Sequence, residues 1–298
     1  MSGKPALGGV MVPITTPFDP VTGDVAPVPL RENARDLLDA GVTGVVATGS
    51  TGEAALLTEG EYAAVIDWLR DVVPDDRWLV AGAGRESTRA TVAACRAAAE
   101  HGADAVLVRP PGYYGPSLSI GALVEHFRRV ADDSPVPVLL YNIPKYTHVA
   151  LQEAVLAALL GHPNVLGAKD SSGDLRNFAS YRQAAPEWAL FIGNGACLYA
   201  GLELGGVGGI LAVANFATAL SAETFTLFMA SDRAGAGAAQ ERLAPLHKGV
   251  VGERGVPGVK AALDAVGRHG GPVRAPLRDL DADDRDHIRV LLAAAGLA

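Results

Sequence analysis

Residues 137–170, PVLLYNIPKYTHVALQEAVLAALLGHPNVLGAKD, decide the fold of this 298-residue chain. The stretch opens with a short apolar run at 137–141, continues through an Ala- and Leu-rich helical pattern at 151–160, and closes with a second apolar run at 165–168. Neither run alternates apolar with polar residues, which is typical of strands in a sheet that is covered on both faces. A strand, a helix and another strand in this order predict a parallel βαβ unit.

The same alternation extends along the chain in both directions from this stretch. Eight apolar runs occur, with helical patterns between them, at 9–15, 44–48, 79–83, 105–108, 137–141, 165–168, 189–192 and 209–213. Eight strand–helix units close a parallel sheet into a barrel. We therefore predict an α/β fold, a (β/α)8 TIM barrel over residues 1–218. No strand pattern follows, so we expect residues 219–298 to form additional C-terminal helices packed on the barrel.

Composition and charge limit the kinds of partner. The chain has 33 Asp and Glu against 25 Lys and Arg, a formal net charge of −8, which argues against nucleic acid or an anionic membrane as a partner. Two cysteines are too few for a disulfide framework, and no run of about 18 apolar residues occurs. We expect a soluble, cytoplasmic protein with reduced thiols.

Lys169 is the first candidate for a reactive group. It follows the buried run at 165–168, and the carboxyl ends of barrel strands carry the chemistry. The chain has only five lysines against twenty arginines, which suggests that this position needs an amine. A lysine in an apolar wall gives up its proton and can attack a carbonyl carbon to form a Schiff base. The structural alternative is an ion pair with the neighbouring Asp170.

Tyr141 ends the strand before that of Lys169, so we expect both side chains over the same mouth of the barrel. A phenol there can transfer protons, although a tyrosine that merely fills the core is the alternative. The turn GSTGE at 49–53 offers hydroxyl and backbone N–H groups that suit a small carboxylate.

Four segments taken together point to a known family: TTPF at 15–18, GSTGE at 49–53, YNIP at 141–144 and GAKD at 167–170. Their order and spacing resemble the dihydrodipicolinate synthase/N-acetylneuraminate lyase superfamily, and the similarity extends through 204–210, 255–260 and 274–277. The resemblance implies a (β/α)8 barrel that forms a Schiff base with pyruvate or another 2-oxo acid. It also implies no metal or other cofactor, and a homotetramer built as a dimer of dimers.

The same resemblance implies roles for individual residues. Lys169 would be the Schiff-base lysine, Tyr141 the proton relay, and Ser50 and Thr51 the pair that holds the 2-oxo acid carboxylate. Ser50 would also take part in the relay.

Further residues would line the pocket or complete it from a second subunit. Ile210 and Gly193 would lie beside the pyruvate. A tyrosine of the pair Tyr113–Tyr114 would reach the relay of the neighbouring subunit, and we assign Tyr114 to this role.

Departures from the family pattern bear on the substrate. Tyr146 stands where dihydrodipicolinate synthases carry an arginine for a distal carboxylate, which disfavours that activity but leaves it as an alternative. Gly195 and Ala196 stand where sialic acid lyases carry an Asp–Glu pair, which counts against sialic acid. Arg85 and Arg109 are the cations available for a distal carboxylate.

We therefore predict a carbon–carbon lyase that splits or joins pyruvate and a small aldehyde, most similar to 4-hydroxy-2-oxoglutarate aldolases. Aldolases and dehydratases of 2-oxo-3-deoxy sugar acids are close alternatives. A metal-dependent aldolase would need converging ligands, and of the seven histidines only His148 lies near a strand end. A catalytically silent barrel that binds a 2-oxo acid is the remaining alternative.

Overall fold

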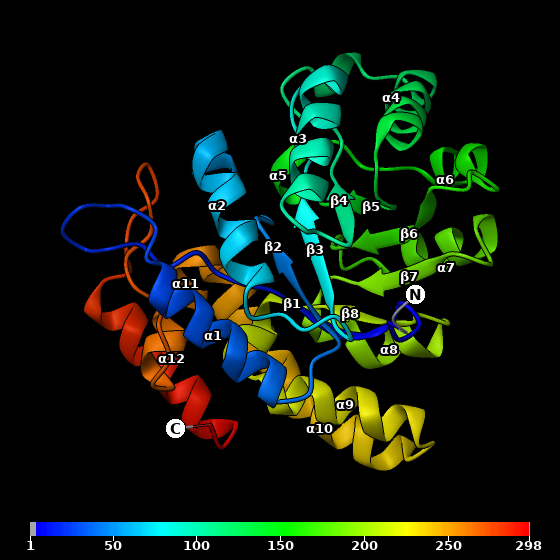
Figure 1. Ribbon diagram of the computed structural model, residues 1–298. Coiled ribbons are helices and arrows are strands. Elements are labelled where there is room, and N and C mark those ends of the chain that lie inside the picture. The colour runs from blue at the N-terminus through cyan, green and yellow to red at the C-terminus, as the bar shows by residue number, and fades with distance from the viewer. Residues whose placement is uncertain (1–3, 298) are drawn as a thin grey trace.

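A computed structural model describes residues 4–297 of the chain. Eight parallel strands form a closed barrel in sequence order, and β8 pairs with β1 to complete the ring (Figure 1). The strands are β1 (Gly9–Pro13), β2 (Gly44–Ala47), β3 (Trp78–Gly82), β4 (Ala105–Val108), β5 (Val138–Asn142), β6 (Val165–Asp170), β7 (Ala189–Ile192) and β8 (Gly208–Ile210). The predicted (β/α)8 barrel is confirmed.

Helices surround the barrel and connect its strands. The α-helices up to β8 are α1 (Pro27–Asp39), α2 (Glu59–Arg70), α3 (Thr88–Glu100), α4 (Ile120–Asp133), α5 (Pro144–Thr147), α6 (Glu153–Leu159), α7 (Leu175–Ala184) and α8 (Leu198–Glu203). Short 3-10 turns are η1 (Ala54–Leu56), η2 (Gly115–Ser117), η3 (Gly195–Cys197) and η4 (Ala212–Asn215). Local signals fix several helix starts: Thr58 and Glu61 form a reciprocal capping box at the start of α2.

The last predicted strand, at 209–213, is shorter than expected. β8 stops at Ile210, and the chain turns into η4 at Ala212. The buried side chain of Asn215 replaces strand pairing there, because its amide donates to the Pro13 carbonyl and its oxygen accepts from the Thr15 N–H.

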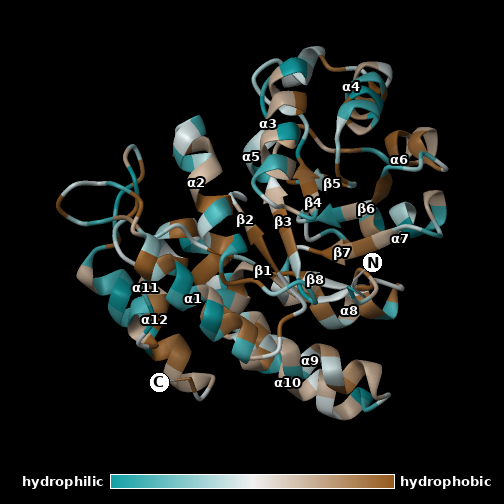
Figure 2. Ribbon diagram, viewed as in Figure 1, coloured by the Kyte–Doolittle hydropathy of each residue, from teal (hydrophilic) through white to brown (hydrophobic). Residues whose placement is uncertain are grey.

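The barrel interior is filled with side chains rather than open. Met11, Val46, Val80, Ala105, Leu107, Leu139, Tyr141, Ile143, Phe191 and Ile210 form this inner cluster. A larger apolar cluster lies between the strands and the surrounding helices, and Figure 2 shows the strands as mostly hydrophobic ribbons. Because the interior is packed, a ligand can enter only at an end of the barrel.

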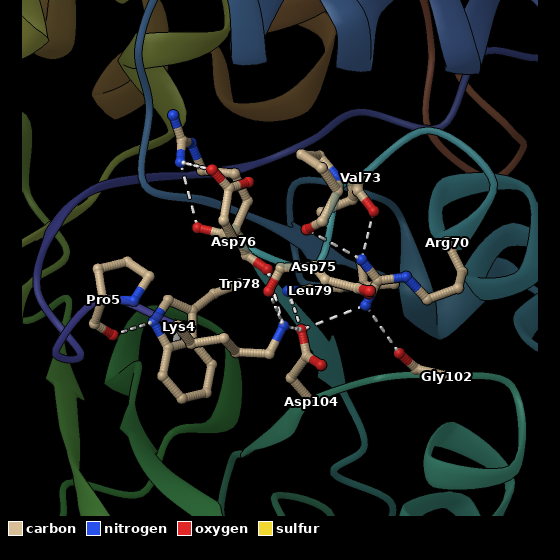
Figure 3. Close-up of polar contacts among 12 residues, drawn as sticks. Lys4, Pro5, Arg70, Val73, Asp75, Asp76, Trp78, Leu79, Gly102 and Asp104 are labelled. Atoms are coloured by element: carbon tan, nitrogen blue, oxygen red, sulfur yellow. Dashed lines mark hydrogen bonds and ion pairs between the residues drawn. The ribbon is translucent and has the colours of Figure 1, made fainter. Parts of the chain in front are cut away.

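Polar contacts occupy the end of the barrel where the strands begin. Asp104, just before β4, accepts from the ammonium of Lys4 at 2.9 Å, the guanidinium of Arg70 at 3.3 Å and the N–H of Leu79 at 2.8 Å (Figure 3). The N-terminal segment is fastened there, since the Trp78 indole donates to the Pro5 carbonyl. These contacts join the N-terminal segment to the starts of β3 and β4.

The chain after β8 forms α9 (Thr218–Met229), α10 (Arg233–Leu246), the π-helical turn η5 (His247–Gly252), α11 (Glu253–Ala265) and α12 (Ala282–Ala294). These helices lie along one side of the barrel (Figure 1). They share the outer apolar cluster with the barrel, and the division of the chain at residue 218 stays a prediction. Within residues 4–297, no helix is both long enough and apolar enough to span a membrane.

Candidate active site

Lys169 and Tyr141 lie side by side at the carboxyl ends of neighbouring strands. They are register partners on β6 and β5, and the Lys169 Nζ lies 4.3 Å from the centroid of the Tyr141 ring. Lys169 is only 4% exposed. Burial lowers the pKa of Lys169 to about 7, because a charged amine is poorly solvated there. A neutral amine, the form that attacks carbonyl carbon, is therefore well populated near neutral pH.

Asp170 is not the partner of this lysine. Successive residues of a strand point to opposite faces, and the Asp170 carboxylate accepts from the amides of Asn142 at 2.8 Å and Asn177 at 3.1 Å. It also accepts from the hydroxyl and the N–H of Ser172, both at 2.9 Å. The structural alternative of a Lys169–Asp170 ion pair is therefore wrong.

The phenol of Tyr141 has two neighbouring hydroxyl groups, those of Ser50 and Ser171. Burial raises the pKa of Tyr141 to about 12, while hydrogen bonding with the Ser171 and Ser50 side chains works in the opposite direction. Tyr141 is thus protonated near neutral pH and stands between two hydroxyls, an arrangement that can pass protons. Ser171 was missing from the sequence prediction, although its place directly after Lys169–Asp170 is a usable signal.

The turn at 49–53 is fixed by a buried ion pair. The Glu53 carboxylate lies 2.6 Å from the Lys260 ammonium and also accepts from the Arg274 N–H at 2.8 Å. The Thr16 hydroxyl donates to the Gly52 carbonyl at 2.7 Å. Glu53 itself has a left-handed backbone (φ +56°), an unusual conformation for a residue with a side chain. The serine and threonine of this turn are therefore held in place by α11 and by the segment before α12.

Gly193 lies against Lys169. A Cβ at this position would stand 3.0 Å from the Lys169 Cε and 2.0 Å from the Ser171 Oγ. Any side chain would collide with the Ser171 hydroxyl and press tightly on Lys169, so glycine leaves the lysine room. Ile210 is fully buried and belongs to the inner cluster that also contains Tyr141.

A cavity of about 810 Å³ opens above these residues. Thr48, Gly49, Ser50, Leu107 and Tyr141 line its floor, and one wall comes from the C-terminal region, at residues 253–257 and 276–277. Lys169 does not line the cavity directly but lies against Tyr141, which does. Thr51 is outside the lining, whereas Tyr146 is part of it.

The two arginines predicted as ligands for a distal carboxylate line the cavity but already bind carboxylates. Arg85 makes a two-pronged contact with Glu59, both distances being 3.0 Å, and its guanidinium lies over the Tyr62 ring. Arg109 binds Glu86 at 2.8 Å, and Glu86 also accepts from two backbone N–H groups. Neither arginine therefore offers a free charge.

The tyrosine pair is away from this cavity. Tyr113 and Tyr114 are 80% and 70% exposed, with their rings packed edge to face. Tyr114 lines a separate cavity beside α4. Its predicted role in a neighbouring subunit stays a prediction.

His148 is an exposed residue with a left-handed backbone at the end of α5. Among residues 4–297, no three His, Cys, Asp or Glu side chains are arranged to hold a metal ion.

A known protein family matches nearly the whole chain. The model of the dihydrodipicolinate synthetase family matches residues 6–295. The chain belongs to this family. Its members are lyases and synthases that act through a Schiff base with pyruvate, so the chain is a lyase of this class.

Individual relatives agree with this membership. A DapA-like lyase of Halobacterium salinarum is 39% identical over 99% of this chain and 97% of its own length. A 4-hydroxy-tetrahydrodipicolinate synthase of Methanoculleus marisnigri is 35% identical over 90% of this chain and 91% of its own. The prophage protein YagE of E. coli K12, solved in complex with pyruvate, superposes with a TM-score of 0.93 at 27% identity, covering 99% of this chain and all of YagE.

Proposed function

We propose that this member of the family is a class I aldolase that splits or joins pyruvate and a small aldehyde, with Lys169 as the Schiff-base residue. The observation that carries the proposal is a buried lysine with a lowered pKa, lying 4.3 Å from the ring of a tyrosine that has two neighbouring hydroxyls. This setting supplies a neutral nucleophile and a path for protons in one place.

The residues have distinct parts in the proposed reaction. The Lys169 amine attacks C2 of the 2-oxo acid to give a carbinolamine, and its hydroxyl takes a proton through Tyr141 and leaves as water, which gives a protonated imine. Ser50 and Thr51 hold the carboxylate, with the N–H groups of their turn.

Cleavage follows from this imine. The proton of the 4-hydroxyl leaves through Tyr141 and its neighbouring hydroxyls, the C3–C4 bond breaks, and its electrons pass to the iminium nitrogen as an enamine forms. The aldehyde departs. Protonation of the enamine at C3 and hydrolysis of the imine then release pyruvate and the free lysine.

For the substrate we propose 4-hydroxy-2-oxoglutarate, which yields glyoxylate beside pyruvate. Glycine and alanine at 195 and 196, and Tyr146 in place of arginine, support a small partner. The name of the Methanoculleus marisnigri relative favours a second candidate, synthesis of 4-hydroxy-tetrahydrodipicolinate. Sugar-acid aldolase or dehydratase activity is a third. We further propose a homotetramer in which the exposed Tyr114 reaches a neighbouring subunit, testable by light scattering.

Borohydride trapping tests the central proposal. The protein is incubated with pyruvate, reduced with sodium borohydride and weighed intact by mass spectrometry. We expect one reduced pyruvyl adduct per chain in the wild type and none in Lys169→Ala. Lys248→Ala, which removes an exposed lysine outside the cavity, is the matched control and should retain the adduct. A wild type without an adduct would favour a silent barrel or a different 2-oxo acid.

A further inference from the structure

The cationic side chains that line the cavity differ in whether they bind a carboxylate. Four line it: Arg85, Arg109, Lys145 and Arg254. The first two bind Glu59 and Glu86, as described above. Arg254 binds Asp284 at 2.7 Å and Glu253 at 3.0 Å, and it also donates to the Gly249 carbonyl. The three arginines are therefore neutralised by carboxylates.

Lys145 is the exception. Within residues 4–297, no carboxylate lies within 4.0 Å of its ammonium, which makes a single hydrogen bond, to the Gly252 carbonyl at 2.8 Å. An ammonium has three donors, so two remain for a ligand. Four carboxylates line the cavity and do not cancel this charge: Glu59, Glu86 and Glu253 each have an arginine partner, and Glu53 is paired with Lys260.

The position of Lys145 places that charge at the outer part of the cavity. It is in α5, directly after the strand that carries Tyr141, and is next to Tyr146. Its one hydrogen bond fastens it to the end of η5. Tyr146 packs on the following turn, since its hydroxyl lies 3.6 Å from where a Cβ on Gly255 would stand. Gly255 has φ +61°, the left-handed region that suits glycine. The lysine therefore sits where the β5 loop and the C-terminal wall meet.

We infer that Lys145 binds the carboxylate of the aldehyde partner, the group that lies distal to the Schiff base. The inference rests on the proposed function. It assigns to Lys145 the task for which Arg85 and Arg109 were the candidates from sequence, and it makes this site selective for aldehydes that carry a carboxylate. If Arg109 moved to bind the aldehyde, Glu86 would lose its countercharge, because two backbone N–H groups hold Glu86 in place. Leaving a carboxylate without its partner is costly.

The test compares aldehydes with and without a carboxylate. Condensation with pyruvate is measured for glyoxylate and aspartate semialdehyde, and for the uncharged glycolaldehyde and propanal, in wild type and Lys145→Met. We expect kcat/KM for the two carboxylate aldehydes to fall about 10- to 100-fold, as for loss of a hydrogen bond to a charged group. Rates with the uncharged aldehydes should not change, and Lys145→Arg should keep most of the preference. Lys248→Met is the matched control and should behave as wild type.

Three results would overturn the inference. One is a wild type that forms the pyruvate adduct but shows no preference for carboxylate aldehydes. Another is an equal loss with all four aldehydes in Lys145→Met. The third is a selective loss in Arg85→Gln or Arg109→Gln while Lys145→Met keeps the preference. Failure of the proposed function is a separate result, because it removes the borohydride adduct itself.

Discussion

Within residues 4–297, two lysines are almost completely buried, and they differ in what surrounds the amine. Lys169 is 4% exposed, and burial is the one cause that lowers its pKa. Lys260 is 1% exposed; burial lowers its pKa too, but the Glu53 carboxylate at 2.6 Å opposes this, and the ammonium also donates to the Pro272 carbonyl at 2.7 Å.

The comparison teaches that burial alone does not decide what a lysine does. An ammonium with a carboxylate and a carbonyl beside it is held as a charged structural group, whereas an amine against an aromatic ring is poised to lose its proton. The first joins the C-terminal region to the turn at 49–53, and the second is available for chemistry.

The largest expected effect separates the two lysines by activity. In Lys169→Met we expect turnover to fall about 10⁴-fold or more, because no other amine can form the imine. The free energy of unfolding should stay the same or rise, since the change removes a buried amine without a carboxylate partner. Steady-state kinetics and urea unfolding measure both. A loss of stability in Lys169→Met as large as the loss expected below for Lys260→Met would contradict the difference between the two lysines.

The second-largest expected effect is a loss of stability when Lys260 is replaced. Lys260→Met leaves the Glu53 carboxylate buried without its countercharge, and we expect unfolding to become easier by about 3 to 5 kcal/mol. Urea denaturation followed by circular dichroism measures this loss. The double variant Glu53→Gln/Lys260→Met removes the stranded charge and should recover part of it. A double variant that is no more stable than Lys260→Met would show that packing, rather than charge, is responsible.

The smallest expected effect is the pH dependence of adduct formation, which tests the lowered pKa of Lys169. Below pH 7 the Lys169 amine is increasingly protonated, so the rate of adduct formation with pyruvate should fall about tenfold per pH unit. Above pH 7 the rate should level off, because the neutral amine is then the main form. Stopped-flow trapping between pH 5 and 9 measures the profile. Tyr141, with its raised pKa, stays protonated throughout. A rate that keeps rising to pH 9 would contradict a lowered pKa for Lys169.

The sequence predicts the fold well because the signals for it are local. Each buried strand is a short apolar run, and the observed strands start within one residue of the predicted runs. The strand ends agree less well, and the run at 209–213 differs most, since β8 stops at Ile210 and Asn215 replaces strand pairing with side-chain hydrogen bonds. The placement of Lys169 and Tyr141 side by side was also predictable, because each stands at the end of such a run on neighbouring strands.

The rest of the site depends on contacts between distant segments. Nothing near Glu53 in the sequence indicates Lys260, and nothing near Arg85 or Arg109 shows that carboxylates from other loops already bind them. Which cation is free is a property of the folded charge distribution. A single sequence therefore pointed to Arg85 and Arg109 and gave no reason to select Lys145.

The wall that the C-terminal region adds to the cavity has a consequence for how the protein matures. The ribosome completes all eight strands, with Lys169 and Tyr141, before it reaches residue 253. A nascent chain at that stage has its chemical groups but lacks the countercharge of Glu53 and the outer wall at 253–257 and 276–277. The ion pair of Glu53 and the outer wall of the cavity are therefore both acquired at the end of synthesis.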